Sequence, residues 1–246
     1  MIRGITPELL YGESSVPRRL ISRNSQAAPQ STAVAWEPFL TVHSGVSDVD
    51  ASSQTRVNLQ TASERDLTAI QGITESIARA IVAHRGRNTF QSIVDLLEVR
   101  APGSGGSANA SGPALISEDL FLEIADRVVA GENDQGGSGA GEVNINTAPL
   151  EVLACLPGLD RQSAQGVLNQ RKSGGPFKNI AWLLRVPGID REKFKQLASR
   201  VTARSETFRV TAEGKVTASG VRQRVQCVFR VNASGISTLA YREDDL

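Results

Sequence analysis

The chain has 246 residues, a formal net charge of +1, 40% apolar residues and 4% aromatic residues. This length leaves room for several small domains with cores of their own, and the balanced charge disfavours a general nucleic-acid binder and favours a protein partner. The longest apolar runs, such as residues 152–156, are far shorter than the roughly 20 residues needed to cross a bilayer, and residues 1–20 contain no signal-peptide core, so the chain is expected to be soluble.

Residues 1–56 form an N-terminal segment with one recognisable element. The run Phe39-Leu40-Thr41-Val42-His43 predicts a short strand that joins a sheet formed elsewhere in the chain.

The middle of the chain contains an internal repeat. Val57-Asn58-Leu59-Gln60-Thr61-Ala62 aligns with Val143-Asn144-Ile145-Asn146-Thr147-Ala148, and the match continues with a loop insertion around residues 100–113 of the first copy. The repeat units are predicted to span residues 57–130 and 143–203, with a Gly-rich linker over residues 131–142.

Each unit predicts a helical hairpin. A first helix, with Thr61 or Thr147 as its expected N-cap, ends at Gly72 or Gly158, where glycine permits a tight turn before a second helix. A buried phenylalanine and a third helix complete the unit.

These hairpins resemble the helix-hairpin-helix pattern, which occurs both as a clamp for DNA phosphates and as a plain structural unit. Thr74 and Asp160 stand where DNA-binding members usually have a second glycine, and the Asp160 carboxylate would oppose a phosphate. A structural role is therefore favoured; in the alternative, the DNA-binding residues would be Arg161, Arg171 and Lys172.

Residues 204–246 predict β-structure. Apolar and polar residues alternate over 208–216, 221–231 and 237–242, with a turn at Ser219-Gly220. The predicted class is thus α+β: two helical repeat units followed by an antiparallel sheet with one solvated face.

Chemically reactive residues are few. The only histidines, His43 and His84, lack Ser, Cys or Asp partners in a catalytic pattern, so no enzyme is expected. Cys155 and Cys227 form no metal motif and are expected to be either a disulfide or two buried thiols. Glu132 and Asp134 suggest a weak calcium loop, but a solvated linker is favoured because the spaced ligand pattern is missing.

The order of these parts resembles the K minor pseudopilin of type II (general) secretion. The resemblance rests on Arg3-Gly4-Ile5-Thr6-Pro7-Glu8-Leu9, the paired Val-Asn-x-x-Thr-Ala segments and Phe208-Arg209-Val210-Thr211-Ala212-Glu213-Gly214. It implies a pilin-like body with a helical insertion, some members of the family carrying calcium. It also implies an N-terminal inner-membrane helix that this chain lacks, and a periplasmic location in a Gram-negative bacterium.

The resemblance further implies a structural role at the tip of the periplasmic pseudopilus, with the I and J minor pseudopilins as partners. Nucleic acid is disfavoured as a partner by the balanced charge and by Thr74 and Asp160 in the hairpins. The alternative of a different class is a periplasmic helix-hairpin-helix protein that binds DNA, akin to the competence receptor.

Overall fold

The computed structural model describes residues 5–6, 9–10, 12, 35–41, 43, 49–102, 111–130, 141–232 and 235–245. The chain divides into two units, residues 1–43 and 44–246, and each is described by itself. In the first unit, the 3-10 helix η3 (Glu37–Phe39) replaces part of the expected strand, and no strand occurs at the described residues 40, 41 and 43. That prediction was wrong because Pro38 lies in the first turn of η3, where its fixed φ favours a helix.

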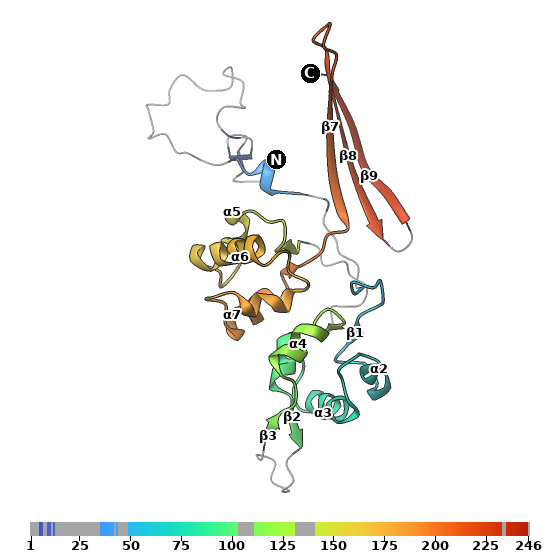
Figure 1. The fold of residues 1–246 in the computed structure, drawn as a ribbon, viewed down its shortest axis with the longest axis vertical. Coiled ribbons are helices and arrows are strands. Elements are labelled where there is room, and N and C mark those ends of the chain that lie inside the picture. Colours follow the sequence, from blue (N-terminus) through green and yellow to red (C-terminus); the bar gives the residue numbers. More distant parts are fainter. Residues whose placement is uncertain are drawn as a thin grey trace. The chain divides into compact units, whose positions relative to one another are not determined.

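The second unit contains two helical repeats built from corresponding elements, except that the first has an additional pair of strands, β2 and β3 (Figure 1). The first repeat consists of β1 (Val57–Asn58), α2 (Glu64–Thr68), α3 (Glu75–Arg85), η4 (Ile93–Glu98), β2 (Arg100–Pro102), β3 (Ser111–Ala114), α4 (Glu118–Ile124) and β4 (Val128–Val129). The second consists of β5 (Val143–Asn144), α5 (Leu150–Leu153), α6 (Arg161–Ser173), η5 (Ile180–Arg185), α7 (Arg191–Leu197) and β6 (Val201–Thr202). Parallel pairing of β1 with β4, and of β5 with β6, closes each repeat on itself.

The repeated Val-Asn-x-x-Thr-Ala segment ties the closing strands to the loop that carries the buried phenylalanine. The Gln60 Oε1 atom accepts the Phe90 backbone N–H at 3.0 Å, and the Asn146 Oδ1 atom accepts that of Phe177 at 2.7 Å. Phe90 is 0% exposed and Phe177 is 5% exposed. The motif therefore encodes a tether that holds a core side chain in each repeat.

The first helix of each repeat begins two residues later than predicted. Thr61 is not the N-cap of α2, because its N–H and that of Ala62 donate to the Asn58 carbonyl in a turn that precedes the helix. Ser63 caps α2 in a capping box with Asp66. In the second repeat Thr147 makes the same turn, and α5 follows Pro149 without a side-chain cap.

The two repeats share one hydrophobic core, and they meet where α4 packs against η5 and α7 packs against η4. The rings of Phe121 and Phe194, both 0% exposed, meet edge to face with centroids 6.2 Å apart. Around them Asn179 Nδ2 donates to the Leu122 carbonyl at 2.7 Å. Both apolar packing and a buried hydrogen bond therefore fix one repeat against the other.

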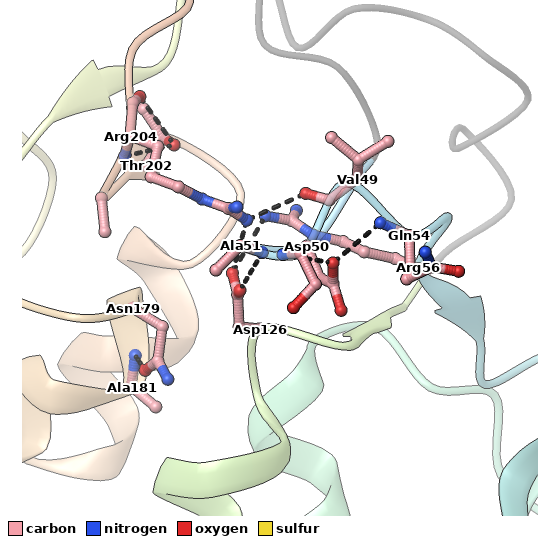
Figure 2. Close-up of polar contacts among 12 residues, drawn as sticks. Val49, Asp50, Ala51, Gln54, Arg56, Asp126, Asn179, Ala181, Thr202 and Arg204 are labelled. Carbon is pink, nitrogen blue, oxygen red and sulfur yellow. Dashed lines mark hydrogen bonds and ion pairs between the residues drawn. The ribbon is translucent and has the colours of Figure 1, made fainter. Parts of the chain in front are cut away.

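A partly buried aspartate joins the ends of the two repeats (Figure 2). Asp126 Oδ1 lies 2.6 Å from Arg204 and 3.5 Å from Arg56, and its Oδ2 atom accepts the Ala51 N–H at 2.8 Å. The same Arg204 guanidinium donates to the Val49 carbonyl at 2.9 Å. This carboxylate links the segment before the first repeat to the residues that follow the second.

Three long strands form the C-terminal antiparallel sheet, as predicted: β7 (Thr207–Lys215), β8 (Arg222–Asn232) and β9 (Gly235–Asp245), in the order β7-β8-β9. Gly220, with φ of +76°, forms the turn between β7 and β8. The arrangement is a simple meander, which many folds contain, and it does not by itself establish a pilin-like body. Among the described residues, no helix has the length and apolar character needed to cross a membrane.

We expect Gly72→Ala to destabilise the protein by about 1 to 2 kcal/mol, because the residue has φ of +98° and an added Cβ would lie 2.7 Å from Leu120 Cδ1. Gly86→Ala is the matched control. Gly86 has a right-handed helical conformation and enough space for a Cβ atom, so the stability of this variant should differ little from that of wild type. Urea unfolding followed by circular dichroism measures both. Equal midpoints for the two variants would contradict the role assigned to Gly72.

A second prediction concerns Asp95, which is 4% exposed and lies 2.7 Å from Lys195 Nζ across the repeat interface. Lys195→Met should cost about 1 to 3 kcal/mol, since it leaves a buried carboxylate without its cation. The exposed Lys172→Met serves as control.

The same pair sets a pH dependence. The hydrogen bond to Asp95 raises the pKa of Lys195 above its ordinary 10.5. The contribution of this ion pair to the stability of the folded protein is therefore complete below pH 10.5. It is lost as the pH rises through the higher folded-state pKa of Lys195. If wild type and Lys195→Met lose stability in parallel above pH 10.5, this pair is not responsible.

Candidate nucleic-acid interface

Each repeat contains the expected hairpin turn. Gly72 and Gly158 have φ of +98° and +75°, and each lies between two apolar residues that are buried in the core. The glycines themselves, and the residues that begin the following helices, are exposed. Each turn is therefore anchored in the core by its flanking apolar residues, while its glycine and the start of the next helix are open to solvent.

The second repeat has another turn of the same form, which the sequence analysis missed. Val186-Pro187-Gly188-Ile189-Asp190 repeats the pattern of Leu156-Pro157-Gly158-Leu159-Asp160 thirty residues later, and Gly188 has φ of +89°. A search for repeats within the unit, as well as between units, would have found it. In the first repeat the corresponding place is occupied by the β2–β3 hairpin.

The two turns of the second repeat lie against each other's helices. Ser163 Oγ, in the first turn of α6, donates to the Gly188 carbonyl at 3.4 Å. Lys193 Nζ, in the first turn of α7, donates to the same carbonyl at 2.8 Å and lies 3.9 Å from the Asp160 carboxylate. Both turns, and the exposed start of α6, therefore belong to one surface.

The start of α6 has unpaired backbone donors. Asp160 caps the helix by accepting the Ser163 N–H at 2.7 Å, and this hydrogen bond holds the pKa of its carboxyl below the ordinary value. Within the described part of the chain, the N–H groups of Gly158 and Arg161 donate to no protein acceptor. Such groups, together with the positive end of the helix dipole, favour an anion.

The first turn of α6 also differs from the corresponding turn in every other α-helix of the repeats. The first turns of α2, α3, α4, α5 and α7 all contain an acidic residue, whereas α6 contains none. Arg161 begins α6, and Glu75 occupies the equivalent position in the first repeat. A cation at this position interacts unfavourably with the helix dipole, and an anion bound at the turn would offset that interaction.

Charge is divided unequally between the repeats. Residues 143–203 contain nine Lys and Arg against four Asp and Glu, a net charge of +5. Residues 57–130 contain six against nine, a net charge of −3. The whole-chain value of +1 conceals this division, and the earlier inference that the chain is not basic enough for nucleic acid does not hold for the second repeat.

The structure separates the three residues suggested for DNA binding. Arg161 is exposed beside the turn at Gly158. Arg171 donates to the Ile145 carbonyl at 3.1 Å, as Arg85 does to the Ala62 carbonyl at 2.6 Å, and so has a structural role. Arg171 and Lys172 lie about 15 Å along α6 from Arg161, because each helical residue rises about 1.5 Å.

The remaining candidate residues are the two suggested calcium ligands, the two cysteines and His84. Glu132 and Asp134, the suggested calcium ligands, lie outside the described residues. Cys155 is exposed rather than buried, Cys227 is half-buried, and both are free thiols. His84 is half-buried beside the ring of Phe90, at 5.1 Å between centroids.

Comparison with known proteins supports the hairpin repeats. Residues 52–103 and 138–202 match the family model of the helix-hairpin-helix motif. ComE operon protein 1 of Bacillus subtilis is 36% identical over 69 residues, which cover 28% of this chain and 33% of that protein.

Endonuclease/exonuclease/phosphatase family domain-containing protein 1 is also similar, at 28% identity over 166 residues in the rat and human proteins. The match covers 61% of this chain but only 28% of either relative. No solved structure gives a significant match.

These matches overturn the predicted relationship to the K minor pseudopilin. They connect the hairpin repeats to a ComE-type protein, and the predicted roles in type II secretion and in capping a pseudopilus were wrong. The prediction of the I and J minor pseudopilins as partners was therefore wrong. The expectation that nucleic acid is unlikely was wrong as well.

Proposed function

We propose that the protein binds DNA through the second repeat, with the turn at Gly158 and the start of α6 in contact with a backbone phosphate. The observation that carries this proposal is the exposed, acid-free first turn of α6 within a repeat of net charge +5. The match to the helix-hairpin-helix model and the similarity to ComE operon protein 1 support it.

Few groups are needed to bind a backbone phosphate at this turn. A phosphate oxygen accepts the free N–H groups at Gly158 and Arg161, and the helix dipole adds to the attraction. The Arg161 guanidinium is free to bind a second oxygen of the same or the next phosphate. Because these groups read no base edges, binding is expected to be independent of sequence.

The carboxylate of Asp160 does not block this arrangement. Its Oδ1 atom is turned back to the Ser163 N–H, and Lys193 Nζ lies 3.9 Å from its Oδ2 atom. The negative charge is thus shared between the helix start and a lysine, and the N–H of Arg161 remains available. The turn at Gly188 contributes by holding Lys193 in place.

We expect wild-type protein to bind duplex DNA with a steep salt dependence, and Arg161→Gln to weaken binding and reduce the slope of log K against log salt by about 1. Fluorescence anisotropy of a labelled duplex at several salt concentrations gives both values. Arg87→Gln, which removes an exposed arginine from the first repeat, is the matched control and should leave the slope unchanged.

Two results would count against the proposal. Absence of salt-sensitive binding by the wild-type chain would exclude the function. Equal losses for Arg161→Gln and Arg87→Gln would show that general charge, and not the hairpin of the second repeat, determines affinity.

A further inference from the structure

All Lys and Arg residues of the three C-terminal strands lie on one face of the sheet. Side chains alternate along a strand, and directly paired residues of an antiparallel sheet point to the same side. The register pairs Arg209 with Val228, and Lys215 with Arg222. Continued through β9, it defines a basic face whose charged members are Arg209, Glu213, Lys215, Arg222, Arg224, Arg230, Arg242 and Asp244.

The carboxylates on the basic face do not neutralise it. Glu213 is shared between Arg222 at 3.5 Å and Arg224 at 3.6 Å, and Asp244 pairs with Arg242 at 2.5 Å. Six cations therefore face two carboxylates. Arg209 and Lys215 are exposed and make no ion pair among the described residues.

The opposite face has a different character. Its exposed side chains include Phe208 at 44%, Val210 at 50% and Tyr241 at 60%, and its described positions contain no Lys or Arg. Strict segregation of all six cations is therefore not a consequence of a generally polar sheet. One face of this sheet has a strong positive field, and the other has none.

The basic face is long and narrow. Arg209 and Lys215 are six residues apart on β7, about 20 Å at roughly 3.3 Å per residue, and three strands at about 4.8 Å spacing make the face about 10 Å wide. Duplex DNA presents one negative charge per about 1.7 Å of its axis, roughly a dozen over this length. An elongated cationic stripe therefore complements a linear polyanion.

We propose that the basic face is a second nucleic-acid surface, which contacts the DNA backbone in addition to the second repeat. This inference rests on the proposed function and extends it from one hairpin to a chain with two backbone contacts. A long duplex that occupies both surfaces gains from the effective concentration of the second, whereas a short duplex occupies only one.

A nucleic acid fits the basic face better than an anionic membrane does. Surfaces that bind membranes combine cations with exposed Trp, Phe or Leu that enter the lipid. On the basic face most uncharged residues are polar, such as Thr211 and Gln226, and the apolar Val228 and Ala240 are buried and half-buried. The aromatic residues of the sheet lie on the other side.

The test compares Arg209→Gln/Lys215→Gln with wild type, Arg161→Gln and the control Arg65→Gln/Arg87→Gln, which removes two arginines from the first repeat. Anisotropy is measured over a salt series with duplexes of about 40 and about 10 base pairs. The sheet variant should bind the long duplex roughly fivefold or more weakly, with a salt slope smaller by about 1 to 2. The control should change affinity less than about twofold. Circular dichroism verifies that each variant is folded.

The outcomes separate the two proposals. Wild-type affinity for the sheet variant, with loss for Arg161→Gln, overturns the basic face and leaves the hairpin function standing. Loss for the sheet variant alone supports the basic face and removes the hairpin. No DNA binding by wild type overturns both. Vesicles of phosphatidylserine and an acidic peptide are tested in parallel, and loss of binding to either one alone would assign the face to that ligand instead.

Discussion

The two repeats are held together at one junction, where α4 and α7 meet through Phe121 and Phe194 and pack against η5 and η4 of the opposite repeat. Both helices have only seven residues, too few to be stable alone in water, so their stability comes from packing. Phe121 and Phe194 occupy equivalent positions in the repeats and are fully buried against each other. Burial of each ring contributes about 1.5 to 3 kcal/mol. Helix against equivalent helix makes this junction approximately two-fold symmetric.

At equivalent positions of this junction the first repeat has acidic residues and the second has arginines. This difference explains how two similar repeats can have different roles. Glu118 and Arg191 begin the equivalent helices α4 and α7, and they meet each other at 2.8 Å. Asp119 pairs in the same region with Arg185. The acidic residues of the first repeat thus bind the neighbouring arginines of the second, and stabilise the junction. Arg161 lacks such a partner, and it remains available beside the turn at Gly158.

Local patterns in the sequence predicted the helices and strands but not the relationship to known proteins. The two hairpins and the C-terminal strands followed from spacing, because glycine turns and alternation depend only on neighbouring residues. The helix caps were misplaced, since Asn58 forms a turn that no periodicity records. The Val-Asn-x-x-Thr-Ala segment suggested a pseudopilin, yet its physical role is to tether Phe90 or Phe177, a requirement of the repeat itself. A motif with that role carries information on fold and little on partners.

The net charge of the whole chain gave no indication of the candidate interface. A net charge of +1 governs the field only at distances larger than the molecule, and salt screens the field there, since the Debye length is about 8 Å at physiological salt. A phosphate in contact with the second repeat responds to the nearest charges. Three cations of the second repeat pair with carboxylates of the first at the junction, which lowers the unpaired balance of the second repeat from +5 to +2 and that of the first from −3 to zero. The same reasoning applies to the C-terminal sheet, whose cations share one face. For this protein, the placement of charge decides whether a polyanion can bind, and its total does not.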